Sequence, residues 1–171
     1  DEATDENGYP VDIGKHIYVT VDWLIHRNQF NGGVNYRGGI EVALCGVLAQ
    51  MLDNEEPIGR DNPLRKITSV PRIHAAQRDS LSKFRFVNLR REEGVGFVFN
   101  SVRTAAHKID SDYTRSSTIR CVNRELSGIR RIARNYLGKP FSPNRLAGLQ
   151  AEIDGFLVAE RRDGFNEGAM A

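Results

Sequence analysis

Residues 113–139 read YTRSSTIRCVNRELSGIRRIARNYLGK and carry seven arginines and lysines against a single acid, Glu125. At about 100° per residue, the apolar side chains of this stretch fall on one arc of roughly 100°, which is typical of a helix packed on a core. Four arginines fall together on a separate arc of roughly 80°. The apolar stripe consists of Ile119, Val122, Leu126, Ile129, Ala133, Tyr136 and Leu137, and the arginine ridge consists of Arg120, Arg124, Arg131 and Arg134.

The arginine ridge needs a counter-charge. Like charges four residues apart repel by roughly 0.2–0.5 kcal/mol per pair, and a solvated helix usually intersperses glutamates to relieve this. A nucleic acid, a phosphate ligand or an acidic surface on another protein would each supply the charge, and the alternative is a face that is merely solvated. Exposed aromatics, Lys clusters or a Gly-rich basic loop, which nucleic-acid binders usually add, do not accompany this helix. We therefore expect acids on another protein subunit to face the ridge and Lys139, and we expect no nucleic acid.

Charge is unevenly distributed along the chain, although the net charge is only +2. The first twelve residues carry five acids, Asp1, Glu2, Asp5, Glu6 and Asp12, and no base. An acidic arm and a basic helix can match head to tail between subunits. The alternative is a disordered tail beside a solvated helix.

Length and composition limit the classes of protein to which this chain can belong. A chain of 171 residues suits one domain with a proper core. No apolar run approaches the roughly 20 residues of a membrane span, and the acidic start is not a signal peptide. Cys45 and Cys121 both fall in predicted helices, which favours buried, reduced thiols.

The hydrophobic pattern predicts an α/β fold, with a mixed β-sheet flanked by helices and an irregular arm over residues 1–15. Residues 16–27 alternate as a strand that buries Ile17, Val19, Val21, Trp23 and Ile25. Residues 40–52 read as a helix buried nearly all round. A short strand near 67–70, a helix around 75–84 and a hairpin of strands near 86–89 and 95–99 follow. Two helices, about 112–137 and 143–161, close the single domain, the second capped by Ser142 ahead of Pro143.

The sequence evidence for a metal, nucleotide or catalytic site is weaker. His107, Asp110 and Asp112 could form a metal or acid/base site, but Asp110 or Asp112 is better explained as a cap of the following helix. The glycines of residues 30–40 match neither a dinucleotide fingerprint nor a P-loop. No nucleophile motif is present, so we expect neither an enzyme nor a cofactor or metal site.

The order of segments resembles the core domain of contractile tail sheath proteins of bacteriophages and related particles. The elements that carry the resemblance are Arg103-Thr104 at a strand end, Ser111-Asp112-Tyr113 opening a helix, Arg120-Cys121-Val122-Asn123 within it, Tyr136-Leu137-Gly138-Lys139 closing it, and Ile153 to Leu157 in the last helix. Together they span roughly residues 16–165. Each element alone is weak, but their order and spacing are specific.

The resemblance implies a structural subunit in a virion tail, assembled in the host cytoplasm. Such subunits form hexameric rings stacked helically around a tail tube, contact baseplate and tail terminator proteins, and contract to drive the tube through a cell envelope. Arms of neighbouring subunits add strands to each core sheet. Acids of the tube or of the adjacent ring would then face the arginine ridge. The family usually has outer domains before this core and an arm after it, so we expect a fragment or a reduced variant.

Overall fold

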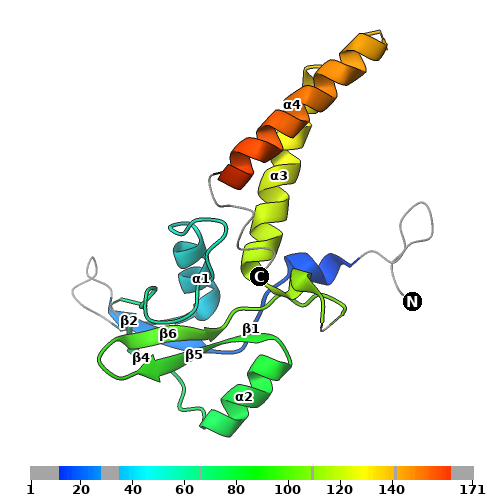
Figure 1. The fold of residues 1–171 in the computed structure, drawn as a ribbon. Helices are drawn as coiled ribbons and strands as arrows, with labels where there is room; N and C mark the ends of the chain where they lie inside the picture. The colour runs from blue at the N-terminus through cyan, green and yellow to red at the C-terminus, as the bar shows by residue number, and fades with distance from the viewer. Residues whose placement is uncertain (1–11, 28–34, 66, 109, 141, 163–171) are drawn as a thin grey trace. The chain divides into compact units, whose positions relative to one another are not determined.

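The computed structural model describes residues 12–27, 35–65, 67–108, 110–140 and 142–162 (Figure 1). Contacts between Cα atoms divide the chain into two compact units. The first unit comprises residues 1–52 and 56–116, and the second comprises residues 53–55 and 117–171. Most of the predicted acidic arm lies outside the described residues. The part that is described ends in a short 3₁₀ helix, Ile13–His16.

The first unit contains a mixed three-stranded sheet. Strand β1 (Val19–Thr20) pairs in parallel with β5 (Phe86–Glu92), which pairs antiparallel with β6 (Gly96–Ser101). The predicted hairpin of β5 and β6 is therefore confirmed. The outer edge of β6 is partly covered, because Ile58 and Leu64 form isolated bridges to Phe99 and Phe97.

A second sheet joins three further strands. Strand β2 (Trp23–Arg27) pairs antiparallel with β3 (Asn35–Gly39) on one side and with β4 (Ile67–Ser69) on the other. The prediction of β4 is confirmed. The sequence did not predict β3, because its composition, NYRGG, is typical of a turn. Pairing with β2, not intrinsic propensity, makes this segment a strand.

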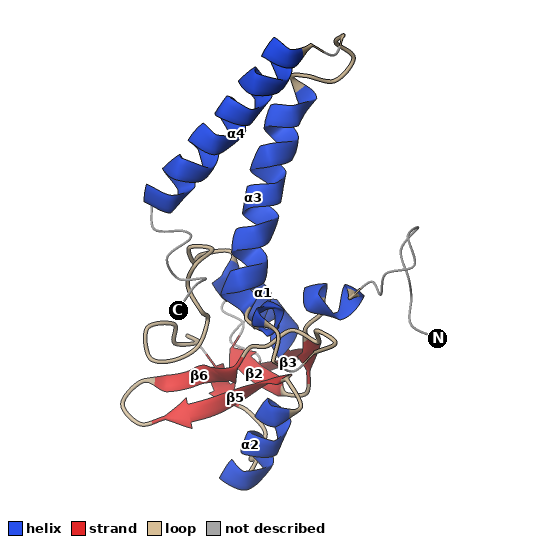
Figure 2. Ribbon diagram, turned by 45° about the vertical axis from the view of Figure 1, so that its right-hand side comes forward, coloured by secondary structure: helices blue, strands red, loops and turns tan. Residues whose placement is uncertain are grey.

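Two helices flank the strands, so the predicted α/β class with a mixed sheet is confirmed. Helices α1 (Ile40–Leu48) and α2 (Ala75–Lys83) lie on opposite sides of the strands (Figure 2). The hydroxyl of Ser82 in α2 accepts hydrogen bonds from the side-chain amides of Asn88 (3.2 Å) and Asn100 (3.0 Å) in the hairpin. The core joins both sheets and α1 through Leu24, Ile40, Leu44, Val87, Leu89, Phe99 and Val102.

The predicted strand over residues 16–27 is wrong in two respects. The chain changes sheet between β1 and β2, and the buried side is the opposite one. Ile17, Val19 and Val21 are 47%, 40% and 39% exposed, whereas Asp22 and Leu24 are 7% and 5% exposed. The Leu89 amide donates to Asp22 Oδ2 at 2.7 Å, which holds the even-numbered side chains inward. Alternation identified a two-sided strand but not which side the core would cover.

The predicted burial of α1 is also wrong. The helix ends at Leu48, and of its residues only Ile40 and Leu44 are buried. Val42 is 74% exposed and Cys45 is exposed, so just one face of α1 contacts the core. An apolar composition on every side did not lead to burial on every side.

The chain between β6 and the long helix differs from the continuous helix predicted over 112–137. A 3₁₀ turn, Asp112–Thr114, is followed by extended Arg115, and α3 runs from Ser116 to Arg134. The Thr104 hydroxyl donates to the Tyr113 carbonyl at 2.6 Å, and the Thr104 amide donates to the Thr114 carbonyl at 3.0 Å. Pairing with the segment after β6 therefore supplies the hydrogen bonds that a continuous helix would have made here.

The second unit is a helical hairpin. Helices α3 and α4 (Pro143–Arg162) run antiparallel, side by side, in both views (Figures 1 and 2). The amide of Arg145 donates to the hydroxyl of Ser142 at 3.4 Å, so the predicted start of α4 at a serine cap is confirmed. The register is fixed by Arg124 against Glu160 and by the Tyr136 hydroxyl, which donates to Glu152 at 2.8 Å.

Candidate assembly surfaces

Half of the arginine ridge is neutralised inside the second unit. Arg120 Nη2 lies 3.2 Å from Asp53 Oδ1, and Arg124 Nη1 lies 3.5 Å from Asp53 Oδ2. Arg124 also donates to both carboxylate oxygens of Glu160, at 3.0 and 3.4 Å. The bonds to Glu160 raise the pKa of Arg124 above its ordinary value. The acids that the sequence led us to expect opposite these two arginines thus belong to the same chain.

The other half of the ridge is exposed. Arg131 and Arg134 lie in the last turn of α3, and both side chains are exposed. Neither forms an ion pair with any residue that the structure describes. Lys139 extends this basic end of the hairpin, with its ammonium 5.8 Å from the ring centre of Tyr136. The ridge therefore has an internally paired half and an outward half.

Sequence reasoning missed the internal partners Asp53 and Glu160. Glu160 follows Phe156 by four residues, so it lies in line with the apolar face of α4, and an acid there is a detectable signal. Asp53 lies 71 residues before Arg124, and no periodicity could reveal that contact. Cys121, next to Arg120, is buried, and burial is the main cause that raises the pKa of its thiol, so this cysteine is a poor nucleophile.

The edge of β1 forms a second candidate surface. Within the described residues this strand has a neighbour, β5, on one side only. Ile17, Val19 and Val21, at alternate positions in and beside this strand, are 39% to 47% exposed. An apolar strand edge with free backbone groups is a template for pairing with another chain.

The predicted cap residues lie at the start of the 3₁₀ turn. Ser111 is the capping residue, and its hydroxyl accepts from the Tyr113 amide at 3.2 Å. Asp112 is the first residue of the turn, and Asp110 is exposed. The acids Asp1, Glu2, Asp5 and Glu6 lie outside the described residues. In the described ranges, no three His, Cys, Asp or Glu side chains are grouped as a metal site would require, and none of the helices could span a membrane.

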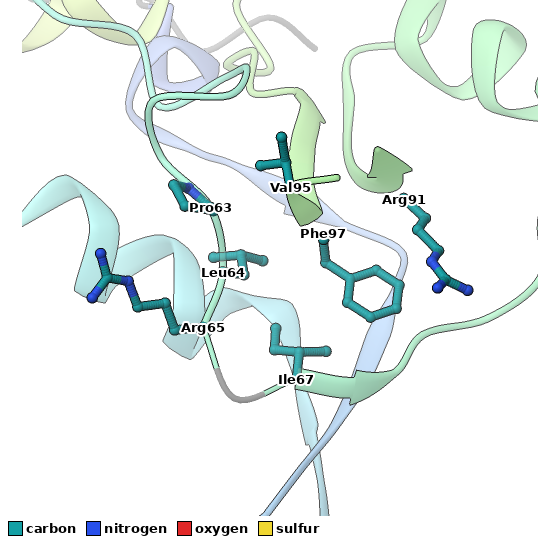
Figure 3. A pocket seen from close by; sticks show the side chains of 8 residues that line it. Pro63, Leu64, Arg65, Ile67, Arg91, Val95 and Phe97 are labelled. Carbon is teal, nitrogen blue, oxygen red and sulfur yellow. The ribbon is translucent and has the colours of Figure 1, made fainter. Parts of the chain in front are cut away.

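A pocket of about 570 Å³ lies at the turn of the β5–β6 hairpin (Figure 3). Apolar residues make up most of its described walls, and Arg65 and Arg91 also line it. Such walls suit an apolar side chain beside a carboxylate. The lining residues are Pro63, Leu64, Arg65, Ile67, Arg91, Val95, Gly96 and Phe97.

The described fold matches solved chains of a contractile particle. A chain in the cryo-EM structure of the anti-feeding prophage helical sheath in its contracted state superposes with a TM-score of 0.74 and 18% sequence identity, covering 95% of this chain and 46% of that chain. The fold is similar to that of the superposed part of this sheath chain. A chain of the six-fold symmetrised anti-feeding prophage baseplate superposes with a TM-score of 0.68 and 17% identity, covering 82% of this chain and 38% of that one. No protein-family model and no curated protein matches the sequence.

These matches confirm, at the level of the fold, the resemblance to sheath proteins that the sequence motifs carry. The hydrogen bonds of Thr104 to Tyr113 and Thr114 bring two of those motifs together in space. The chain spans less than half the length of either sheath or baseplate chain.

Proposed function

We propose that this chain is a structural subunit of a contractile sheath, stacking as hexameric rings around a tail tube and contracting to drive that tube through an envelope. The observation that carries the proposal is the superposition of 95% of the chain on a helical sheath protein with a TM-score of 0.74. The role is structural, with no catalytic step. The tube, the baseplate and the tail terminator are the proposed partners, and the virion tail is the proposed location.

The β1 edge is the proposed site of strand addition by a neighbouring subunit. Its exposed row, Ile17, Val19 and Val21, gives an added strand an apolar surface to cover. Backbone groups on the side of Val19 and Thr20 that does not face β5 would supply the hydrogen bonds of the new pair. These side chains would then be exposed only in the isolated subunit, because the strand of the neighbouring subunit would cover them in the assembly.

The outward half of the ridge is the proposed contact with acids of the tube or of the next ring. Arg131, Arg134 and Lys139 are exposed and so remain available for that contact. The acidic arm of a neighbouring copy is one source of such acids within this sequence. Arg124, whose side chain is 41% exposed, could exchange Glu160 for an external acid when the sheath changes state.

Electron microscopy of assembled particles tests this function. We expect tubes or stacked rings from the full chain and its tube protein, and none from Arg131→Glu with Arg134→Glu. The matched control is Arg72→Glu with Arg161→Glu, which reverses two exposed arginines outside the ridge and should assemble normally. Normal sheaths from the ridge variant would contradict the ridge contact. Dispersed molecules under all conditions would contradict the sheath role itself.

Nucleic-acid binding is the competing function for the same arginines. It predicts steep, salt-dependent affinity for DNA in an anisotropy titration, because each phosphate contact releases counterions. The internal ion pairs of Arg120 and Arg124 leave fewer guanidinium groups for phosphates. We therefore expect only weak association with DNA.

A further inference from the structure

The apolar face of the β5–β6 hairpin extends beyond the core. Leu89 and Phe99 are paired in the hairpin register, and both are buried in the core of the first unit. Two residues closer to the turn, Arg91 is paired with Phe97, so these two side chains lie on the same face of the sheet as Leu89 and Phe99. Phe97 is only half-buried. The hairpin therefore ends in an accessible aromatic ring with an arginine opposite it, and both residues line the pocket in Figure 3.

Backbone hydrogen bonds hold another wall of this pocket in place. The amide of Leu64 donates to the carbonyl of Phe97 at 2.8 Å, and the amide of Gly59 donates to the carbonyl of Phe99 at 3.4 Å. The chain over residues 59–64 is thereby attached to β6 at both ends. A Cβ atom built on Gly96, which also lines the pocket, meets no atom within 4 Å, so the space beside it is open. The pocket is therefore largely preformed, as ligand sites usually are.

The pocket combines an apolar centre with two cationic margins. Leu64, Ile67 and Phe97 are half-buried, whereas Arg65 and Arg91 are exposed. In Figure 3 the apolar side chains lie between the two arginines. A ligand with a single carboxylate would leave one guanidinium group without a counter-charge. A ligand that matches the whole pattern has an apolar group with a carboxylate on either side of it.

The two arginines of the pocket have no counter-charge among the described residues. Arg65 and Arg91 form no ion pair within the part of the chain that the structure describes. Glu92 follows Arg91 in the sequence, but its carboxylate pairs with Arg60 and Arg90 instead. Both guanidinium groups of the pocket thus remain available for the carboxylates of a ligand.

We propose that this pocket is a binding site for a peptide segment of a partner protein, in which one apolar residue lies between two acids. The apolar side chain of the peptide contacts Leu64, Ile67 and Phe97, and its carboxylates bind Arg65 and Arg91. In an extended peptide, side chains two residues apart project to the same side, about 6–7 Å from each other. Acids two residues before and two residues after the apolar residue therefore flank it on the side that faces the pocket.

The size and position of the pocket fit such a ligand. Its volume of about 570 Å³ lies within the roughly 300–1,000 Å³ of typical ligand sites, which is ample for an aromatic side chain. Its lining contains no residue of the arginine ridge or of β1, and β6 lies at the other end of the strand order β1–β5–β6. This site is therefore additional to the proposed sheath contacts and does not depend on them.

Titration of the full 171-residue chain with a short peptide, followed by two-dimensional amide NMR, tests this site. The probe is acetyl-Glu-Gly-Phe-Gly-Glu-amide. We expect a dissociation constant on the order of 0.1–1 mM at low salt, with the largest shifts at the amides of Leu64, Ile67 and Phe97. Probes with Ala in place of Phe, or with Gln in place of both Glu residues, should bind at least about tenfold more weakly, because each lacks one part of the match.

Substitution of the two arginines tests the carboxylate contacts. Arg65→Gln with Arg91→Gln should weaken binding of the probe about tenfold or more, while the far-UV circular dichroism is unchanged. The matched control is Arg72→Gln with Arg161→Gln, which removes two exposed arginines that do not line the pocket. The control should bind the probe as tightly as the wild type.

Several results would overturn this site. One is an absence of binding at probe concentrations up to about 5 mM, and another is equal binding of the Gln probe. Shifts that map mainly to Arg131 and Arg134 would show that any exposed basic surface attracts the peptide. A pocket variant that binds the probe as tightly as the wild type, or no more weakly than the control, would overturn the roles of Arg65 and Arg91.

Discussion

Phe156 of α4 lies against the backbone of Gly128 in α3. A Cβ atom built on Gly128 would overlap the Phe156 ring. This contact explains a glycine in the middle of a 19-residue helix, where glycine normally costs about 1 kcal/mol relative to alanine. The packing of the Phe156 ring offsets this cost, because the ring can contact the α3 backbone only where there is no side chain.

Gly128→Ala should therefore destabilise the protein, although alanine favours helices. We expect the free energy of unfolding to fall by about 1–3 kcal/mol in a urea titration, because the new methyl group must displace the Phe156 ring. Gly155→Ala is the matched control. A Cβ there meets nothing within 4 Å, so that variant should gain about 0.5–1 kcal/mol. Equal effects of the two substitutions would contradict the packing described.

Arg124→Glu should destabilise the hairpin, and Arg131→Glu should not. The first change places a third acid beside Asp53 and Glu160, of which Glu160 is only 9% exposed. We expect a loss of about 1–3 kcal/mol in unfolding free energy, reduced because Arg124 is itself partly exposed. Arg131→Glu should stay within about 0.5 kcal/mol of wild type. If thermal melts show that Arg131→Glu is destabilising and Arg124→Glu is not, the internally paired half of the ridge is not the half that contains Arg124.

Asp22→Ala should destabilise the first unit, because it leaves the Leu89 amide without its acceptor. We expect a loss of about 1–3 kcal/mol, and a smaller loss for Asp22→Asn, whose side-chain oxygen can accept the same bond. The comparison is made by urea denaturation at neutral pH. An alanine variant as stable as wild type would show that this bond contributes nothing.

The same residue predicts a dependence on pH. Burial raises the pKa of Asp22 above its ordinary value of 3.8, so the folded state holds this proton where the unfolded chain has released it. The contribution of Asp22 to stability should therefore fall as pH rises from near 3.8 through the raised folded pKa. Asp22→Asn removes that dependence, so its stability relative to wild type should be greater at pH 7 than near pH 4. A difference that is constant with pH would contradict this.

Arg85→Gly should stabilise the protein. Arg85 follows α2 with φ of 64°, a left-handed conformation that costs a side-chain-bearing residue roughly 1 kcal/mol and costs glycine little. We expect a gain of about 1 kcal/mol in differential scanning fluorimetry. Gly94→Ala is the converse test, since its φ of 79° should make alanine unfavourable although the added Cβ meets no atom. A loss of stability in Arg85→Gly would mean that contacts of its side chain outweigh the strain.

Local pattern predicted the elements that depend on local chemistry. The cap at Ser142 and the proline after it determined where α4 begins, and alternation determined the β5–β6 hairpin. In contrast, β3 could not be predicted, because its glycines favour a turn and only β2 holds it extended. The break at Arg115 likewise depends on pairing with Arg103, twelve residues earlier.

The sequence by itself determined the α/β class, the hairpin, the amphipathic helices and the existence of an arginine ridge, because side-chain spacing sets these through backbone geometry. Only the tertiary structure decided that Ile17 and Val19 face outward, that Arg120 and Arg124 are paired within the chain, and that Leu126 and Leu137 of the α3 stripe are exposed. The physical reason is that periodicity identifies an apolar or charged face of an element, whereas contacts between residues far apart in the chain decide what covers that face.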